Sequence, residues 1–214
     1  MLDRASLPPR ILPEWRVLLL GGVSGTGKST VARQIGLGRG ISWLHLDDFR
    51  LAFQHSRALL PEHNDALYLF WDRPDVFTLP PEQLCDALIG TGQAMIPTVE
   101  IVALTHMEHA GPMVLEGDGI IPSVVHRPLL RGHVAAGRIK AAFLIEPDED
   151  VLLQTMLLRD RGMAARSASE HRTEARAKWL FGQWLAVEAS RYGLSVLEAR
   201  PWETLAARTL DAVG

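Results

Sequence analysis

The stretch LLLGGVSGTGKST, residues 18–30, decides the fold of this chain. An apolar run, VLLL at 17–20, leads into a glycine-rich segment whose residues 22–29 fit the pattern G-x-x-x-x-G-K-[ST]. A short, continuously apolar run bounded by glycine is typical of a strand buried on both faces. Because a helical pattern follows Ser29, the order strand, glycine-rich loop and helix predicts a phosphate-binding P-loop.

Each residue type in this loop has a chemical reason to be there. Gly22, Gly25 and Gly27 permit backbone angles that side chains disfavour, so successive N–H groups can turn inward and form an anion cradle at a helix N-terminus. Lys28 can reach the β- and γ-phosphates of a nucleotide, and the Ser29 hydroxyl can bind Mg²⁺. The predicted nucleotide-binding residues are Gly22, Ser24, Gly25, Thr26, Gly27, Lys28, Ser29 and Thr30.

The composition narrows the class of protein. With 214 residues, of which 47% are hydrophobic and 22% charged, we expect a single domain over residues 1–214 with a large core. A net charge of −3 favours neither a nucleic-acid nor a membrane-surface partner. The single cysteine, Cys85, excludes an internal disulfide and favours a reducing, cytoplasmic setting. No apolar run approaches the roughly 20 residues of a membrane span, and MLDRASLPPR does not resemble a signal peptide.

Apolar runs alternate with helical patterns along the chain, which is typical of an α/β domain with a parallel sheet. The predicted strands are 17–20, 41–46, 112–117, 139–145 and 194–199. We expect the first helix to run from Ser29 to Ile35 and to end at Gly36, Gly38 and Gly40. A longer helical pattern, 80–110, is expected to be interrupted at Gly90, Gly92 and Pro97, and Asp148 is expected to cap the helix after the fourth strand.

Two aspartates follow the second predicted strand, in LHLDDFR at 44–50. A carboxylate at the carboxyl end of a parallel strand beside the P-loop points into the ligand crevice, where it can orient a hydroxyl and accept its proton. Asp47 is our candidate base, and Asp48 is either the alternative base or a substrate or magnesium ligand. Arg50 either holds an anionic acceptor or pairs with Asp47. The pair of aspartates could instead cap the next helix.

The third predicted strand ends in VLEGDG, residues 114–119. Glu116 lies where a carboxylate can hold Mg²⁺ through water, together with Ser29. Asp118 follows two residues later, so we expect it near the acceptor, although a surface turn is an alternative for it.

Arginines cluster after the fourth strand. Arg159 and Arg161 lie in LLRDRG, 157–162, at a helix end, with further arginines in a predicted lid at about 159–176. Arginines on a mobile segment can close over a transferring phosphate and neutralise its charge; a solvated helix face is the alternative. Lysine, by contrast, is rare: of 22 basic residues only Lys28, Lys140 and Lys178 are lysines. Where lysine persists, we expect a site that requires a compact ammonium instead of a planar guanidinium.

On these stretches the chain resembles the small P-loop kinases of the adenylate-kinase-like group. LDDFR at 46–50 resembles the second-strand motif of uridine kinases, zeta toxins and chloramphenicol phosphotransferases, in which the aspartate matching Asp47 acts on the acceptor hydroxyl. VLEGDGIIPS at 114–123 resembles 2-phosphoglycerate kinase-like proteins, although Gly119 stands where their pattern has a histidine. Residues 142–161 resemble the fourth strand and the helix before the lid, whose arginines contact nucleotide phosphates.

The resemblance implies a P-loop NTPase three-layer sandwich, with a five-stranded parallel sheet in the order 2-3-1-4-5 and a helical lid. It also implies an ATP- and Mg²⁺-dependent kinase that phosphorylates a hydroxyl of a small molecule. Residues 49–80, which contain several aromatic side chains, are then expected to wall the acceptor site. A nucleotide-dependent regulatory ATPase without a small-molecule acceptor is the alternative.

Overall fold

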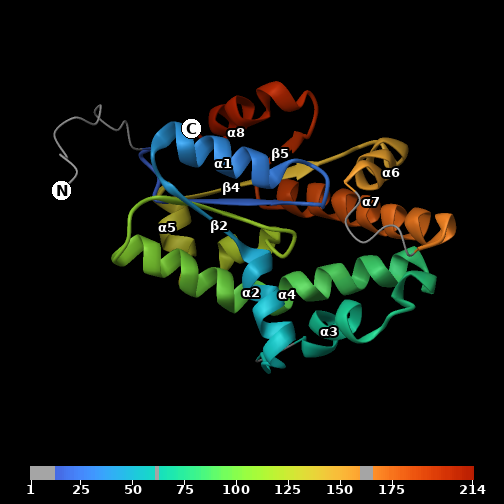
Figure 1. The fold of residues 1–214 in the computed structure, drawn as a ribbon. Coiled ribbons are helices and arrows are strands. Elements are labelled where there is room, and N and C mark those ends of the chain that lie inside the picture. The colour runs from blue at the N-terminus through green and yellow to red at the C-terminus, as the bar shows by residue number, and fades with distance from the viewer. Residues whose placement is uncertain (1–12, 61–62, 160–165) are drawn as a thin grey trace, which may run out of the picture.

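The computed structural model of the chain describes residues 13–60, 63–159 and 166–214. Within these residues, strands pair in parallel into one five-stranded sheet in the order β2-β3-β1-β4-β5, which confirms the predicted topology (Figure 1). The strands are β1 Val17–Gly22, β2 Ser42–His45, β3 Met113–Glu116, β4 Ile139–Ile145 and β5 Ser195–Glu198.

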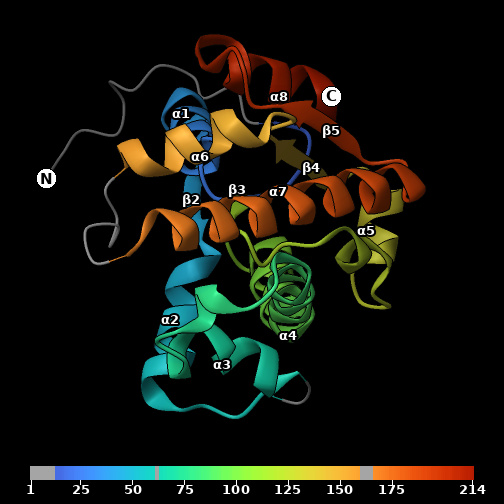
Figure 2. The same ribbon diagram turned by 90° about the vertical axis from the view of Figure 1, so that its right-hand side faces the viewer.

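Helices cover both faces of this sheet, which makes the expected three layers (Figures 1 and 2). The α-helices are α1 Lys28–Arg39, α2 Leu46–Ser56, α3 Asn64–Asp72, α4 Pro81–Glu108, α5 Arg131–Ala135, α6 Glu149–Leu158, α7 Ala168–Arg191 and α8 Leu205–Val213. The short 3₁₀ helices are η2 Val76–Thr78, η3 Pro122–His126 and η4 Trp202–Thr204.

The central strand β1 explains why the sheet needs two covering layers. Its successive side chains point to opposite faces, and all of them are buried. Val17 and Leu19 pack with residues of α4 and α7, whereas Leu18 and Leu20 pack with residues of α1 and α8. The apolar run predicted as a strand buried on both faces is therefore confirmed.

Two helices are longer than their glycines predict. Helix α1 continues through Gly36 and Gly38, and Gly40 ends it in the left-handed conformation with φ 63°. Gly36 lies inside the helix because the Trp43 ring packs on it: a Cβ there would lie 2.4 Å from Cε3 of Trp43. This glycine serves close packing between α1 and β2, and the prediction that it ends the helix is wrong.

Helix α4 is likewise continuous, from Pro81 to Glu108, with Gly90, Gly92 and Pro97 inside it. A Cβ on Gly90 would lie 2.6 Å from Cβ of Ala66, and one on Gly92 would lie 2.4 Å from Cγ2 of Ile121. These glycines let α3 and the segment after β3 approach the helix closely. The expected interruption is therefore wrong, because tertiary packing outweighs the low helix propensity of glycine.

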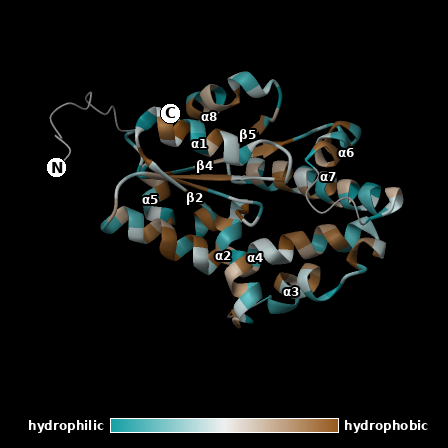
Figure 3. Cartoon of the chain, in the orientation of Figure 1, coloured by the Kyte–Doolittle hydropathy of each residue, from teal (hydrophilic) through white to brown (hydrophobic). Residues whose placement is uncertain are grey.

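Helix α4 is, among the described residues, the one helix long and apolar enough to cross a membrane by length and composition. The sequence alone did not lead us to expect such a segment. However, 56% of its most apolar stretch is buried inside the protein. Many of its apolar residues pack in the core, whereas Ile101 is exposed (Figure 3). Cys85 lies on this helix, and burial raises the pKa of its thiol to about 11, so the thiol stays protonated at neutral pH.

The segment 49–80 forms a helical layer beside α4, made of part of α2, α3 and η2 (Figure 2). The Gln54 amide donates to the Leu67 carbonyl at 2.7 Å, and the Tyr68 hydroxyl donates to the Phe53 and Ala58 carbonyls at 3.0 and 2.6 Å. These bonds tie α2 to α3. Because α2 begins directly after β2, it lies at the carboxyl end of that strand.

We expect Gly92→Ala to lower the free energy of unfolding by about 1–3 kcal/mol, because the new methyl group overpacks buried Ile121. Gly38→Ala is the matched control, since it lies in α1 with no atom within 4 Å of an added Cβ. There alanine should leave stability unchanged or raise it by up to about 1 kcal/mol. Urea unfolding measures both variants, and equal stabilities would contradict the packing role of Gly92.

Candidate active site

The P-loop connects β1 to α1 through glycines with positive φ. Gly22, Gly25 and Gly27 have φ of 138°, 98° and 87°, which is the region that side chains disfavour. At Gly22 a Cβ would also lie 2.3 Å from the Leu144 carbonyl oxygen of β4. The loop backbone is therefore fixed against the neighbouring strand, and Gly27 is the N-cap of α1.

Lys28, the first residue of α1, lies under this loop and is only 6% exposed. Its ammonium donates to the Val23 carbonyl at 2.9 Å and to Oδ1 of Asp118 at 2.5 Å. The Ser24 hydroxyl donates to Oδ2 of the same carboxylate at 2.6 Å. Asp118 thus accepts from two P-loop groups that the sequence pattern assigns to phosphate.

The pairing with Lys28 sets the ionisation of Asp118. Burial by itself would raise the pKa of this carboxyl, but the Lys28 ammonium, the hydrogen bonds from Lys28 and Ser24, and the charge of Lys178 outweigh burial and lower it. Asp118 is therefore an anion at neutral pH. The alternative of a plain surface turn is wrong for this residue, because its carboxylate is bonded within the crevice.

Glu116, at the end of β3, lies beside the start of α1. The Ser29 hydroxyl donates to its Oε1 at 2.7 Å, and Nδ1 of His45 contacts the same oxygen. The sheet register explains the second contact, since His45 and Glu116 are directly paired residues of β2 and β3. The sequence places His45 at a strand end but not beside Glu116, because the register is a long-range property.

Ser29 and Glu116 together offer a hydroxyl and a carboxylate of the kind that binds Mg²⁺. Among the described residues there is no cluster of three or more His, Cys, Asp or Glu side chains that could hold a metal alone. At phosphate sites Mg²⁺ usually takes its other ligands from phosphate oxygens and water.

The two aspartates after β2 have different surroundings. Both lie in the first turn of α2, and neither caps it, because His45 is the N-cap and no side chain bonds there. Asp48 is exposed. The Asp47 side chain, 39% exposed, accepts from Nε of Arg50 at 3.3 Å, and its pKa is raised by burial and then by the nearby charge of Asp118, against the lowering effect of Arg50 and Lys28.

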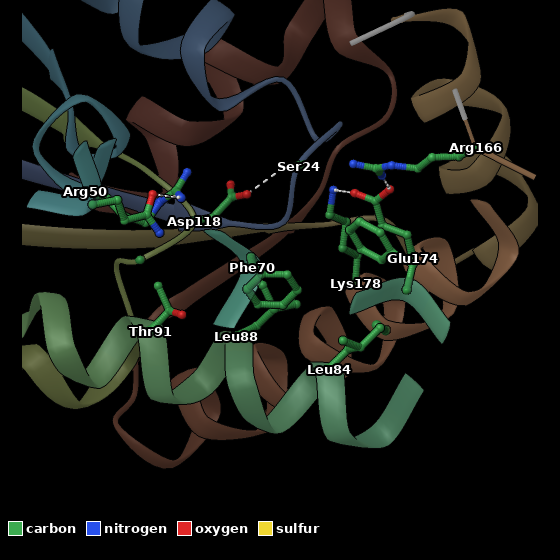
Figure 4. Close-up of a pocket in the computed structure, with 14 residues that line it drawn as sticks. Ser24, Arg50, Phe70, Leu84, Leu88, Thr91, Asp118, Arg166, Glu174 and Lys178 are labelled. Carbon is green, nitrogen blue, oxygen red and sulfur yellow. Dashed lines mark hydrogen bonds and ion pairs between the residues drawn. The ribbon is translucent and has the colours of Figure 1, made fainter. Parts of the chain in front are cut away.

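A cavity of about 240 Å³ opens beside Asp118 (Figure 4). Neither Asp47 nor Asp48 is among its lining residues, although Arg50, which pairs with Asp47, is. On the P-loop side it is lined by Ser24, Asp118 and Arg50, and its floor is formed by apolar side chains of α3 and α4 together with the Thr91 hydroxyl. The apolar floor residues include Phe70, Leu84 and Leu88. Four residues of the segment 49–80 line this cavity, namely Arg50, Gln54, Phe70 and Phe77. That the segment walls an acceptor site stays a prediction.

The far wall of this cavity comes from α7 and the residues just before it. Glu174 accepts from Arg166 and from Lys178, both at 2.6 Å, and the Arg166 guanidinium lies 4.1 Å from the centre of the Phe77 ring. Glu174 and Lys178 are not predicted as site residues from the sequence. The one available signal is that Lys178 is among only three lysines in the chain.

A second cleft, of about 360 Å³, lies on the other side of the P-loop. Gly25, Gly27 and Thr30 form one edge, and the rest is mostly apolar, with Leu158, Trp202 and Leu205. Arg200 lies 4.3 Å from the Trp202 ring centre and is held by Glu146 and Thr155, both at 3.1 Å. This arrangement gives the cleft an aromatic wall.

Of the two arginines predicted to act from the lid, Arg159 lines the second cleft as the C-cap of α6. Arg161 lies outside the described residues, as do residues 160–165 of the predicted lid. The part of the lid from Ala168 onward is the start of α7, capped by Ser167 and Glu170. Closure of this segment over a bound nucleotide stays a prediction.

Asp118 and Asp47 should affect stability in opposite directions. The pKa of Asp118 is lowered, so its charge stabilises the fold above the ordinary value of 3.8, and this stabilisation is lost as pH falls through the lowered pKa. We expect Asp118→Asn to lower the unfolding free energy at neutral pH by about 1–3 kcal/mol.

The pKa of Asp47 is raised, so its ionised form opposes folding, and that cost is relieved as pH falls through the raised pKa toward 3.8. Asp47→Asn should therefore leave stability unchanged or increase it at neutral pH. Urea unfolding at neutral and at successively lower pH tests both variants, with exposed Asp211→Asn as the control. A loss of stability in Asp47→Asn that matches Asp118→Asn would contradict this assignment.

No protein-family model matches the chain, and no curated protein is similar to it in sequence. Among solved structures, it is similar to a gluconokinase from Sinorhizobium meliloti 1021, with 16% identity over 92% of this chain and 90% of that one and a TM-score of 0.47. It is also similar to the shikimate kinase from Acinetobacter baumannii in complex with shikimate, with 16% identity, 92% of each chain covered and a TM-score of 0.48.

A sugar kinase from Janibacter sp. is a further similar structure, with 20% identity over 93% of this chain and 94% of that one and a TM-score of 0.44. All three neighbours are described as kinases. At such identities and scores they do not identify a substrate for this chain. Its fold is established by its own strand order: a doubly covered parallel sheet with a P-loop after the central strand.

Proposed function

We propose that the protein is an ATP-dependent kinase that transfers the γ-phosphate to a hydroxyl group of a small molecule. One observation carries the proposal: the P-loop lies between two separate cavities that share no lining residue. A nucleotide needs an apolar cleft for its base on one side of the phosphates. A kinase also needs a site for the acceptor on the other side, and an ATPase without an acceptor has no use for the second cavity.

The cleft lined by Trp202 and Leu205 is the proposed base site. Its apolar and aromatic walls can bury a planar base, and it adjoins Gly25 and Gly27 of the phosphate loop. Arg159, which lines this cleft, could contact a phosphate or the base. These contacts support ATP as the phosphate donor, as the P-loop pattern predicts.

Lys28 is the proposed phosphate ligand. Its ammonium now pairs with Asp118, whose carboxylate satisfies the donors that a phosphate group would use. An arriving phosphate would exchange with this carboxylate and release Asp118 toward the acceptor cavity. Magnesium would be bound by the Ser29 hydroxyl and, through water, by Glu116. When bound, it would neutralise the phosphate charge.

Asp47 is the proposed base for the acceptor hydroxyl. Its pKa is raised by burial and by Asp118, and a base with a raised pKa binds the transferred proton more readily. Arg50 fixes the carboxylate through its Nε and is itself held by Gln54 at 3.2 Å. Asp118 lines the cavity itself and can orient the hydroxyl.

A screen for phosphate transfer tests this function. We expect ADP release with Mg²⁺ and ATP to rise strongly when one acceptor of a panel of hydroxylated metabolites, nucleosides and aminoglycoside-like compounds is added, with a phosphorylated product visible by mass spectrometry. Lys28→Ala should abolish the activity, and Lys28→Arg should not restore it, because a planar guanidinium does not replace a compact ammonium. ADP release that no acceptor increases would favour the regulatory ATPase.

Asp47→Asn should lower kcat by roughly 10²–10⁴-fold and leave the affinity for ATP unchanged, since it removes a proton acceptor and no nucleotide contact. Steady-state kinetics with the acceptor found in the screen gives kcat, and equilibrium binding gives the affinity. Asp211→Asn, on the exposed face of α8, is the matched control. If Asp48→Asn loses the activity and Asp47→Asn keeps it, Asp48 is the base.

A further inference from the structure

The wall of the acceptor cavity opposite the P-loop carries an unusual set of charges. Glu174 is 8% exposed, and each of its carboxylate oxygens accepts from a different cation: Oε1 from Lys178 and Oε2 from Arg166. One carboxylate between two cations leaves this wall with a net positive charge. Figure 4 shows the three side chains together at one end of the cavity, with Asp118 nearer the other.

Lys178 can bind more than its present partner. An ammonium has three N–H donors, and Glu174 is the one hydrogen-bond acceptor that the structure gives it among the described residues. Its charge also reaches across the cavity, since it contributes to the lowered pKa of Asp118. The ammonium is therefore part of the cavity wall, in addition to its hydrogen bond to Glu174 within α7.

The apolar floor lies between the two charged ends. Phe70 and Leu88 are below the gap that separates Asp118 from Lys178 in Figure 4. A ligand that matches this cavity has a hydroxyl group at the Asp118 end, a short carbon skeleton over the floor, and a negative group at the Lys178 end. A neutral ligand would leave the net positive charge of the far wall without a partner.

We propose that Lys178, assisted by Arg166, binds an anionic group of the acceptor, a carboxylate or a phosphate ester, and that Glu174 is a positioning residue for both cations. The acceptor class is thus a hydroxylated acid or a hydroxylated phosphate ester. This inference rests on the proposed kinase function, because it takes the cavity as the acceptor site.

The rarity of lysine makes a direct test possible. Protein labelled with ¹³C at lysine Cε carries only three labelled side chains, Lys28, Lys140 and Lys178. Lys28→Met, Lys140→Met and Lys178→Met assign the three resonances. The Lys28 resonance then reports on the nucleotide, and the Lys178 resonance reports on the acceptor end of the cavity. Lys140 lies on β4 and does not line the cavity, so its resonance reports on neither ligand.

The probes are glycerol, glycerate and glycerol 3-phosphate, which share a skeleton and differ in the charged group. Mg²⁺ and ADP are present throughout, so that the phosphate loop is filled and the anions cannot bind there instead. We expect the Lys178 resonance to shift with glycerate or glycerol 3-phosphate and not with glycerol. The anion that binds more tightly in this titration identifies carboxylate or phosphate as the preferred group.

Lys178→Met should weaken binding of the preferred anion at least about tenfold, as expected for loss of a charge-assisted hydrogen bond. Lys140→Met, which makes the same chemical change, should bind as the unmodified protein does. Lys178→Arg should retain part of the affinity, because it keeps the charge. Thermal unfolding of the three variants separates a loss of binding from a loss of fold.

Two results would overturn the inference: no shift of Lys178 with either anion while Lys28 responds to ADP, or an equal shift with glycerol. Equal anion binding by Lys178→Met and Lys140→Met would overturn it as well. A Lys28 resonance that does not respond to ADP would instead remove the proposed kinase function, so the two failures are told apart in one titration.

Discussion

A lysine ammonium that is almost entirely out of water needs protein atoms in place of its hydration shell, and the site of this protein is arranged around that requirement. Lys28 finds the Val23 carbonyl and the Asp118 carboxylate. The first is supplied by the turn of the P-loop itself. The second comes from the segment after β3, so the phosphate loop has its buried charge balanced only when β1 and β3 are paired.

From this pair, charge contacts extend in two directions. On one side the Asp118 charge acts on Asp47, which pairs with Arg50, and Arg50 contacts Gln54, whose amide bonds to α3. On the other side the charge of Lys178 helps to lower the pKa of Asp118, and Glu174 accepts hydrogen bonds from both Lys178 and Arg166. The helical layer of 49–80 and the start of α7 are thereby linked electrostatically to the phosphate loop. A change of charge at the loop therefore alters the electrostatic interactions at both walls of the cavity beside Asp118.

Local patterns explain what could be predicted from the sequence. The P-loop, the five strands and the cap at Asp148 each depend on a few neighbouring residues, and the topology followed from the resemblance. Helix ends were predicted less well, because Gly36 and Gly92 are present for contacts with Trp43 and Ile121, which lie in other elements. The contact of His45 with Glu116 and the place of Lys178 in the cavity wall could not be predicted either, because register and helix packing bring together residues far apart in the chain.

The central position of β1 has a consequence for the order in which the protein can acquire its structure. The strand that carries the phosphate loop comes first in the chain, yet both of its neighbours in the sheet, β3 and β4, come much later. A nascent chain that has emerged only as far as α4 contains the complete loop sequence and lacks the carboxylate that neutralises Lys28. The pairing that balances the charge of Lys28 is therefore a late acquisition during synthesis, and a fragment that ends before β3 carries the loop sequence without its carboxylate partner.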